Sequence, residues 1–90
     1  MSDKANFEEL LTFPCMFVFR AVGRADSVVQ AACVSCVERL LDRRVMDVTV
    51  KPSAQGRWRS MRIRVAVLSG DEIRAVYAAL NEVDGVRMVL

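Results

Sequence analysis

The sequence predicts an α+β domain of the ferredoxin-like type, a βαββαβ plait. Its four-stranded antiparallel sheet has the order 4-1-3-2 and carries two helices on one face. In two segments, apolar residues recur at spacings of three and four, and in two others apolar and polar residues alternate. The order of these segments along the chain is β-α-β-β-α-β. Right-handed connections that skip a strand then place both helices on the same face, with the second and fourth strands at the edges.

The chain is long enough for one domain. Its 90 residues bury roughly 60% of the surface that the unfolded chain exposes, so stability is modest and self-association would add to it. We expect residues 1–12 to form an N-terminal arm with one helical turn at Phe7–Leu11. Residues 13–90 are expected to form the single ferredoxin-like domain.

The first strand is expected at Cys15–Gly23. Pro14 precedes this run, which is rich in aromatic and β-branched residues and ends at a glycine. If Phe17 and Phe19 face the helices, Arg20 lies on the opposite, helix-free side, which we term the open face of the sheet.

The first helix is expected to begin at Ser27, because Ser27 and Gln30 fit a capping box in which each side chain satisfies a backbone N–H. An apolar stripe at helical spacing follows, made of Val29, Ala32, Cys33, Cys36, Val37, Leu40 and Leu41. Three basic residues stand at the C-terminal end of this segment, where they interact favourably with the negative end of the helix dipole: Arg39, Arg43 and Arg44.

Two alternating strands joined by a turn form the middle of the chain. The first is expected at Met46–Lys51 and stops at Pro52. In the turn that follows, Gly56 is able to take positive φ. The next strand is expected at Trp58–Leu68. Its inward residues are Met61, Ile63, Val65 and Val67, and its outward residues are Ser60, Arg62, Arg64 and Ala66.

The second helix is expected at Asp71–Val83, with Ser69 and Glu72 as a second capping box. Its buried stripe is Ile73, Val76, Tyr77 and Leu80. Gly85 ends this segment, and a short strand follows at Val86–Leu90. Arg87 joins the open face if the inward residues of this strand are Val86, Met88 and Leu90.

Composition narrows the possible functions. The 13 basic and 11 acidic residues nearly cancel, so a bulk-charge argument for nucleic acid fails. The chain has no histidine, which excludes Ser-His-Asp and Cys-His catalysis within it and any zinc site that uses imidazole. No paired acids, phosphate loop or nucleophile–base set is visible. We therefore expect no catalytic residue, no metal and no cofactor.

The expected location is the cytoplasm. The N-terminal segment lacks the continuous apolar core of a signal peptide, and no apolar run is long enough to span a bilayer. The three cysteines are then expected to be reduced thiols.

Cys33 and Cys36 have the CxxC spacing of redox and metal sites. They sit within the first helix and not at its N-terminus, where the dipole would lower a thiol pKa. Cys15 supplies only a third thiol, whereas a closed zinc site needs four ligands. Because both cysteines continue the apolar stripe, we favour core packing, with thiol redox chemistry as the alternative.

Basic side chains gather on the expected open face of the sheet. The candidate partner or anion surface consists of Lys51, Ser53, Gly56, Arg57, Trp58, Arg62 and Arg64. A solvated sheet face explains the same pattern, since polar side chains belong where a sheet meets water. RNA recognition needs several aromatic platforms, and Trp58 is the only aromatic residue in this region, so nucleic acid is not the preferred partner.

A second candidate site is the loop between the first strand and the first helix, where free N–H groups suit an anion. Its tentative ligand residues are Gly23, Arg24, Asp26 and Ser27. Ordinary connection chemistry explains these residue types equally. The apolar edge strand Val86–Leu90 predicts a homodimer formed by strand pairing, unless the N-terminal arm covers that edge.

Three stretches, Phe13–Pro14, Val50–Ser60 and Val86–Leu90, resemble the YbeD-like family of small bacterial proteins of unknown function. The resemblance implies a bacterial cytoplasmic protein with a plait similar to ACT regulatory domains, which bind amino acids and dimerise beside metabolic enzymes. The ACT ligand loop corresponds to Gly23–Ser27. Here Gly23 precedes Asp26 rather than following it, which departs from the usual ACT pattern.

These observations predict a small, non-enzymatic regulatory or adaptor domain that binds a partner protein or a small metabolite. The alternative is an anion- or RNA-binding module that uses the basic open face.

Overall fold

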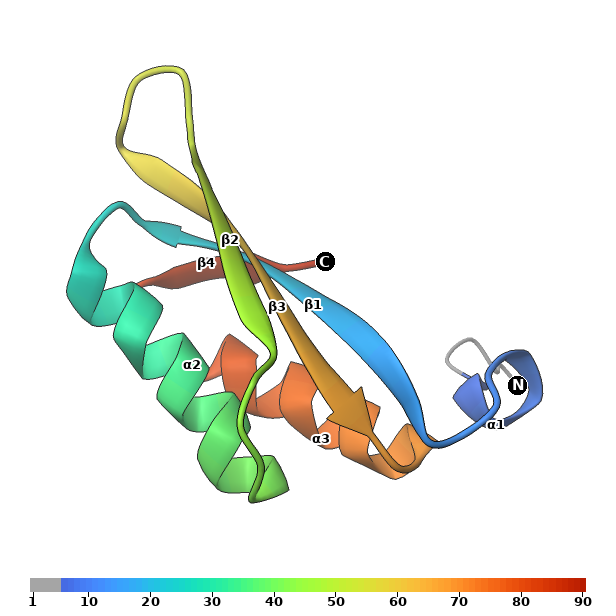
Figure 1. The fold of residues 1–90 in the computed structure, drawn as a ribbon. Coiled ribbons are helices and arrows are strands. Elements are labelled where there is room, and N and C mark those ends of the chain that lie inside the picture. The colour runs from blue at the N-terminus through green and yellow to red at the C-terminus, as the bar shows by residue number, and fades with distance from the viewer. Residues whose placement is uncertain (1–5) are drawn as a thin grey trace.

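The computed structural model describes residues 6–90, and its elements follow the predicted order after a short N-terminal helix (Figure 1). The elements are α1 (Phe7–Leu10), β1 (Cys15–Arg24), α2 (Ser27–Leu41), β2 (Asp47–Pro52), β3 (Trp58–Val67), α3 (Gly70–Asn81) and β4 (Val86–Val89).

The sheet has the strand order β2-β3-β1-β4, and all three strand pairs are antiparallel. This order is 4-1-3-2 read from the other edge, so the predicted topology is confirmed. The long strands β1 and β3 form the centre, and β2 and β4 lie at the edges. Helices α2 and α3 both cover one face of the sheet and leave the other face open (Figure 1).

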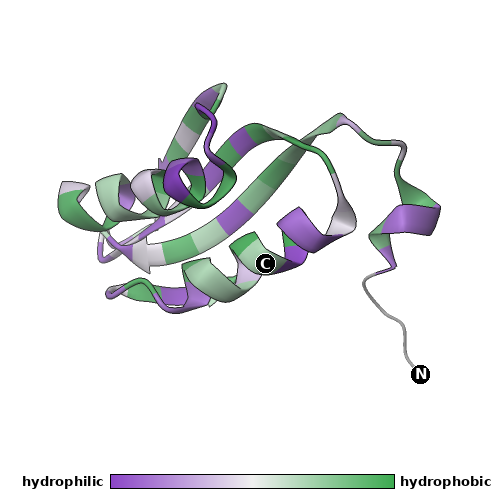
Figure 2. Ribbon diagram, turned by 90° about the horizontal axis from the view of Figure 1, so that it is seen from below, coloured by the Kyte–Doolittle hydropathy of each residue, from purple (hydrophilic) through white to green (hydrophobic). Residues whose placement is uncertain are grey.

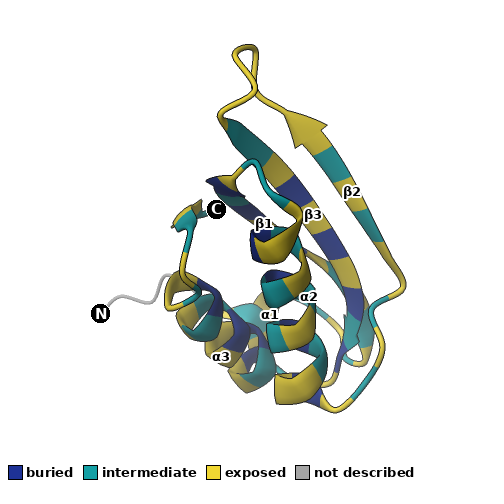
Figure 3. Ribbon diagram, turned by 90° about the vertical axis from the view of Figure 1, so that its left-hand side faces the viewer, coloured by how far each residue is buried: buried dark blue, intermediate teal, exposed yellow. Residues whose placement is uncertain are grey.

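The core lies between the sheet and the two long helices. Figure 3 shows buried and exposed residues alternating along β3, and Figure 2 shows the matching alternation of hydropathy along the strands. The buried side chains are Phe19, Ala21, Val29, Cys33, Val37, Leu41, Met61, Ile63, Val65, Val67, Ile73, Val76 and Leu80. The inward face predicted for β3 is therefore confirmed, and Arg20, Arg62 and Arg64 lie on the open face.

The helix starts differ in part from the predicted capping boxes. At α2 the N-cap is Asp26 and not Ser27, because an Asp26 carboxylate oxygen accepts from the Val29 N–H at 2.9 Å. Aspartate caps as well as serine does, and both stand at this helix start. At α3, Ser69 accepts from the Glu72 N–H at 3.2 Å as predicted, but the Glu72 carboxylate accepts from the Leu68 N–H instead of completing the box.

The condition stated for β4, with Val86, Met88 and Leu90 facing inward, is met only at Val86. Val22 pairs with Met88 and Gly23 pairs with Val86, so Arg87 is an extra residue in a β-bulge. Val86 and Val89 consequently both pack against the core, whereas Met88 and Leu90 are exposed. A bulge shifts the alternation by one residue, and sequence alternation alone cannot show where it occurs.

The predicted helical turn near Phe7 is confirmed as α1. The Phe7 ring meets Phe17 edge-on at 6.0 Å, and the Glu8 carboxylate pairs with Arg74 at 2.7 Å. The described part of the N-terminal segment thus lies against β1 and α3. Residues 1–5 of the predicted arm lie outside the described residues, and the division at residue 12 stays a prediction.

Candidate functional site

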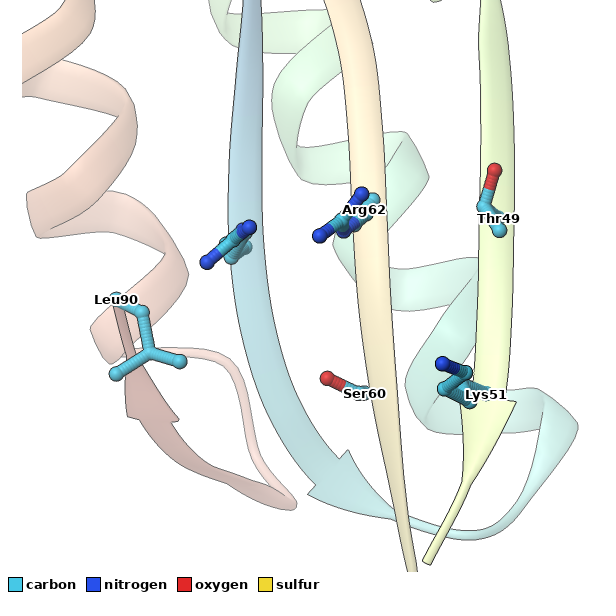
Figure 4. Close-up of a pocket in the computed structure, with 6 residues that line it drawn as sticks. Thr49, Lys51, Ser60, Arg62 and Leu90 are labelled. Carbon is cyan, nitrogen blue, oxygen red and sulfur yellow. The ribbon is translucent and has the colours of Figure 1, made fainter.

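The strand register gathers cationic and hydroxyl side chains on the open face. Arg20 of β1 lies opposite Arg62 of β3, which lies opposite Thr49 of β2. In the next row, Ser60 lies opposite Lys51. These residues and Leu90 line a depression of about 250 Å³, which we term the cationic pocket (Figure 4). In this view α2 and α3 lie behind the sheet, so the pocket is on the helix-free side.

The charges of the cationic pocket are not neutralised by neighbouring carboxylates. In the described part of the chain, Arg20, Arg62 and Lys51 form no ion pair. Arg64, two residues further along β3, is bound by the Asp47 carboxylate at 2.9 and 3.0 Å. The positive charge of the open face is therefore concentrated in the pocket.

The sequence predicted part of this pocket. Lys51 and Arg62 were in the proposed surface, and Arg20 was expected beside them once Phe17 and Phe19 faced inward. Thr49 lies two residues from Lys51 along β2 and so shares its face, and the outward alternation of β3 includes Ser60. Leu90 was missed, because the bulge at β4 reverses the direction of its side chain.

Trp58 lies near the end of the open face and already has a partner. The Arg87 guanidinium lies over the Trp58 ring, 4.9 Å from its centroid, an arrangement that stabilises both groups by a cation–π interaction. One face of the indole is thus occupied within the chain. This contact reduces the value of Trp58 as a stacking platform for a nucleic-acid base.

Ser53, Gly56 and Arg57 lie in the turn between β2 and β3, which projects beyond the rest of the sheet (Figure 1). Gly56 has φ +75° as predicted, and its N–H donates to the Ser53 carbonyl at 3.0 Å. The Ser53 hydroxyl accepts from the Trp58 N–H at 3.3 Å. Turn chemistry accounts for Ser53 and Gly56, and their role in partner binding stays a prediction.

The loop between β1 and α2 uses most of its own donors. The Arg24 N–H donates to the Gly85 carbonyl at 2.9 Å, and the Ala25 N–H donates to the Arg57 carbonyl at 3.0 Å. The Asp26 N–H donates to the Arg24 carbonyl at 2.8 Å. These bonds anchor the loop to its neighbours, and Asp26 serves as the α2 cap.

Gly23, next to the last residue of β1, has a packing role. It is buried, and an added Cβ would lie 2.9 Å from a Val29 methyl and 3.1 Å from the Gly85 carbonyl oxygen. Arg24 lies 3.9 Å from the carboxylates of Asp26 and Asp84. Close packing explains Gly23, and capping of α2 explains Asp26. Ligand binding by Gly23, Arg24, Asp26 and Ser27 stays a prediction.

The two cysteines of the CxxC pair contribute to the core, as the favoured interpretation predicted. Cys33 is buried and Cys36 packs against the core. Burial raises the pKa of the Cys33 thiol to about 11, and burial also raises the pKa of Cys36. Among residues 6–90, no group of three or more metal-ligating side chains is found. None of the described helices has the length and apolar character needed to cross a bilayer.

The architecture defines an ACT-like α/β plait. The ACT domain from the GTP pyrophosphokinase of Chlorobium tepidum superposes with a TM-score of 0.67 and 17% identity, covering 86% of this chain and 96% of that domain. The solution structure of a protein from H. pylori superposes with a TM-score of 0.75 and 15% identity, covering 89% of this chain and 85% of that one. At such identities the likeness concerns the fold.

The particular family follows from sequence similarity. A family model described as a protein of unknown function, DUF493, matches residues 8–90, and the chain belongs to this family. A UPF0250 protein of Shewanella sp. strain ANA-3 is 40% identical over 85 residues, which are 94% of this chain and 96% of the relative. A UPF0250 protein of Shewanella oneidensis is 39% identical over the same shares. The resemblance to a family of small bacterial proteins is thus confirmed.

Proposed function

We propose that this chain is a non-catalytic regulatory or adaptor domain that binds a partner protein or a small metabolite through the open face of its sheet. The observation that carries the proposal is the direct cross-strand pairing of Arg20 with Arg62. Like charges directly opposite each other destabilise a sheet. An anionic group bound between them removes this repulsion, so the arrangement favours the bound state.

The groups with shifted pKa values are poor candidates for acid–base catalysis. Hydrogen bonds from arginine lower the pKa of Glu8 and Glu72. Burial raises the pKa of Cys33, Cys36 and Tyr77. A general acid or base works best with a pKa near the operating pH. Each of these shifts moves the pKa of the group further from neutral pH, which disfavours acid–base catalysis by that group.

A binding domain of this kind acts by differential affinity. A ligand or partner that binds one conformational state better than another shifts the population toward that state. The similar ACT domain is part of GTP pyrophosphokinase, and by fold analogy we expect this chain to act beside another protein. We expect this to occur in the cytoplasm, with self-association through the edge strand β4 as a further part of the proposal.

The test is affinity capture from native bacterial lysate, with mass spectrometry of the retained proteins and metabolites. The wild-type chain is compared with the double variant Arg20→Gln/Arg62→Gln. The matched control, Arg39→Gln/Arg44→Gln, removes two exposed charges outside the sheet. A species retained by the wild type and the control but lost by the open-face variant is the expected result.

Equal retention by all three proteins would overturn the assignment of the binding face. A catalytic turnover that depends on a side chain of this protein would overturn the non-catalytic role.

A further inference from the structure

The positive charge of the open face that has no partner within the described chain is confined to the cationic pocket. Arg64 is neutralised by Asp47, and Arg87 lies over Trp58. The remaining cations of this face, Arg20, Arg62 and Lys51, converge on one depression. A ligand group that complements three cations carries more than one negative charge.

The donor set of the pocket exceeds what a carboxylate can accept. A carboxylate has two oxygens with about four acceptor sites, and a single arginine fork already occupies one site on each oxygen. Here two guanidinium groups, one ammonium group and the hydroxyls of Thr49 and Ser60 line the same depression. Phosphate offers three strongly accepting oxygens and a charge close to −2. Arg20 and Arg62 are direct cross-strand neighbours, so their Cβ atoms stand about 4.5–5.5 Å apart and both forks can reach one phosphate.

The size of the pocket favours a small ligand. Its volume of about 250 Å³ lies below the roughly 300–1,000 Å³ of pockets that enclose drug-sized molecules. The Leu90 side chain forms one apolar wall, and Val22 and Met88 are paired neighbours in the adjoining row. A phosphate with a short carbon skeleton fits this combination of a charged floor and an apolar side.

We propose that the cationic pocket binds the phosphate monoester of a small phosphorylated metabolite. This inference rests on the proposed function and names the class of its ligand. Arg20 and Arg62 hold the phosphate oxygens from two adjacent strands, and Lys51 adds charge from the third. The hydroxyls of Thr49 and Ser60 donate to the remaining oxygen positions.

The test is a ¹⁵N–¹H NMR titration of the full chain with glycerol 3-phosphate at constant ionic strength, with glycerol as the neutral control. The expected result is saturable shifts at the backbone amides of Arg20, Thr49, Ser60 and Arg62, and no shifts with glycerol. Loss of one charge-assisted contact in Arg20→Gln or Arg62→Gln is expected to weaken binding about tenfold. The matched control Arg64→Gln changes a residue already paired with Asp47 and is expected to alter affinity less than about twofold.

The ionisation of the ligand gives a second readout in the wild-type protein. The second pKa of a phosphate monoester is about 6, so lowering the pH from about 7.5 to about 5.5 reduces the dianion fraction about fourfold. The chain has no histidine, the one side chain that ordinarily titrates in this interval. Affinity for glycerol 3-phosphate is therefore expected to fall about fourfold. Inorganic sulfate, a dianion throughout, is expected to bind with unchanged affinity.

Absence of saturable shifts at the open face would overturn the inference, as would equal weakening by Arg62→Gln and Arg64→Gln. A pH-independent affinity for glycerol 3-phosphate would overturn it as well, and this readout needs no variant to fold. If lysate capture still depends on Arg20 and Arg62 while the phosphate titration is negative, the ligand class is wrong and the proposed function stands.

Discussion

The ion pair between Arg43 and Glu72 joins the segment after α2 to the first turn of α3. Its two contacts run in parallel, from Nη1 to Oε1 at 2.7 Å and from Nη2 to Oε2 at 2.8 Å. Arg43 also donates to the Ala66 carbonyl at 2.9 Å, and the Leu68 N–H donates to Glu72 at 2.8 Å. Replacing Glu72 by glutamine removes the charge and keeps the shape of this junction.

The exposure of the pair sets the expected magnitude. The Arg43 and Glu72 side chains are 23% and 24% exposed. This lies between surface pairs, which contribute about 0–1 kcal/mol, and buried pairs, which cost about 3–5 kcal/mol when one partner is removed. The amide of Glu72→Gln still accepts from Leu68. We therefore expect a loss of about 1–2 kcal/mol, or a fall in Tm of roughly 5–15 °C for a domain of this size.

The effect of Glu72→Gln depends on pH with a defined sign. The hydrogen bond from Arg43 holds the pKa of Glu72 below its ordinary value in the folded state. The contribution of the carboxylate is therefore complete above the unfolded pKa of about 4.3 and is lost as the pH falls through the lower, folded pKa. The stability gap between wild type and variant is expected to be wide near neutral pH and to close in acid.

The assay is urea denaturation followed by the fluorescence of Trp58, the single tryptophan, at neutral pH and at several acidic values. The matched control is Asp47→Asn, which also removes a carboxylate from an arginine pair. Asp47 and Arg64 are 51% and 47% exposed, so this change is expected to cost less than about 0.5 kcal/mol. Equal losses in the two variants, or a gap that does not change with pH, would refute the reasoning.

Three further predictions concern local structure. Asp26→Ala is expected to cost about 1 kcal/mol in urea denaturation as the α2 cap, and Ser27→Ala less than about 0.5 kcal/mol; equal costs would contradict the assignment of the cap. Gly85→Ala should destabilise more than Gly56→Ala in the same assay. Both glycines have positive φ, but only at Gly85 would the new Cβ lie 2.5 Å from a valine methyl, so equal losses would exclude a packing effect. Iodoacetamide at about pH 8 should label Cys33 on the order of a hundredfold more slowly in the native than in the unfolded chain, because burial raises its pKa to about 11; similar rates by mass spectrometry would oppose this.

The features that the sequence predicted correctly depend on local patterns. Alternation along β3 identified its buried face, and Gly56 marked the turn with positive φ. The sequence was insufficient where two neighbouring residues were equally good helix caps, and where pairing with a strand distant in sequence determined which way a side chain faces. Asp26 and Ser27 are both good caps, and only the hydrogen bond to Val29 distinguishes them. The bulge at Arg87 depends on how β4 pairs with β1, which no pattern within β4 reports.

The same distinction explains why the candidate site was only partly visible in the sequence. Alternation places Arg62 and Arg64 on one face and treats them as equivalent. The register of β2 separates them, because it sets Asp47 opposite Arg64 and Thr49 opposite Arg62. A slip of β2 by two residues would keep every side chain on its face and bring Asp47 to Arg62, which would cancel one of the pocket's three positive charges. A net charge of only +2 is thus compatible with a concentrated cationic site, since strand register decides which charges cancel.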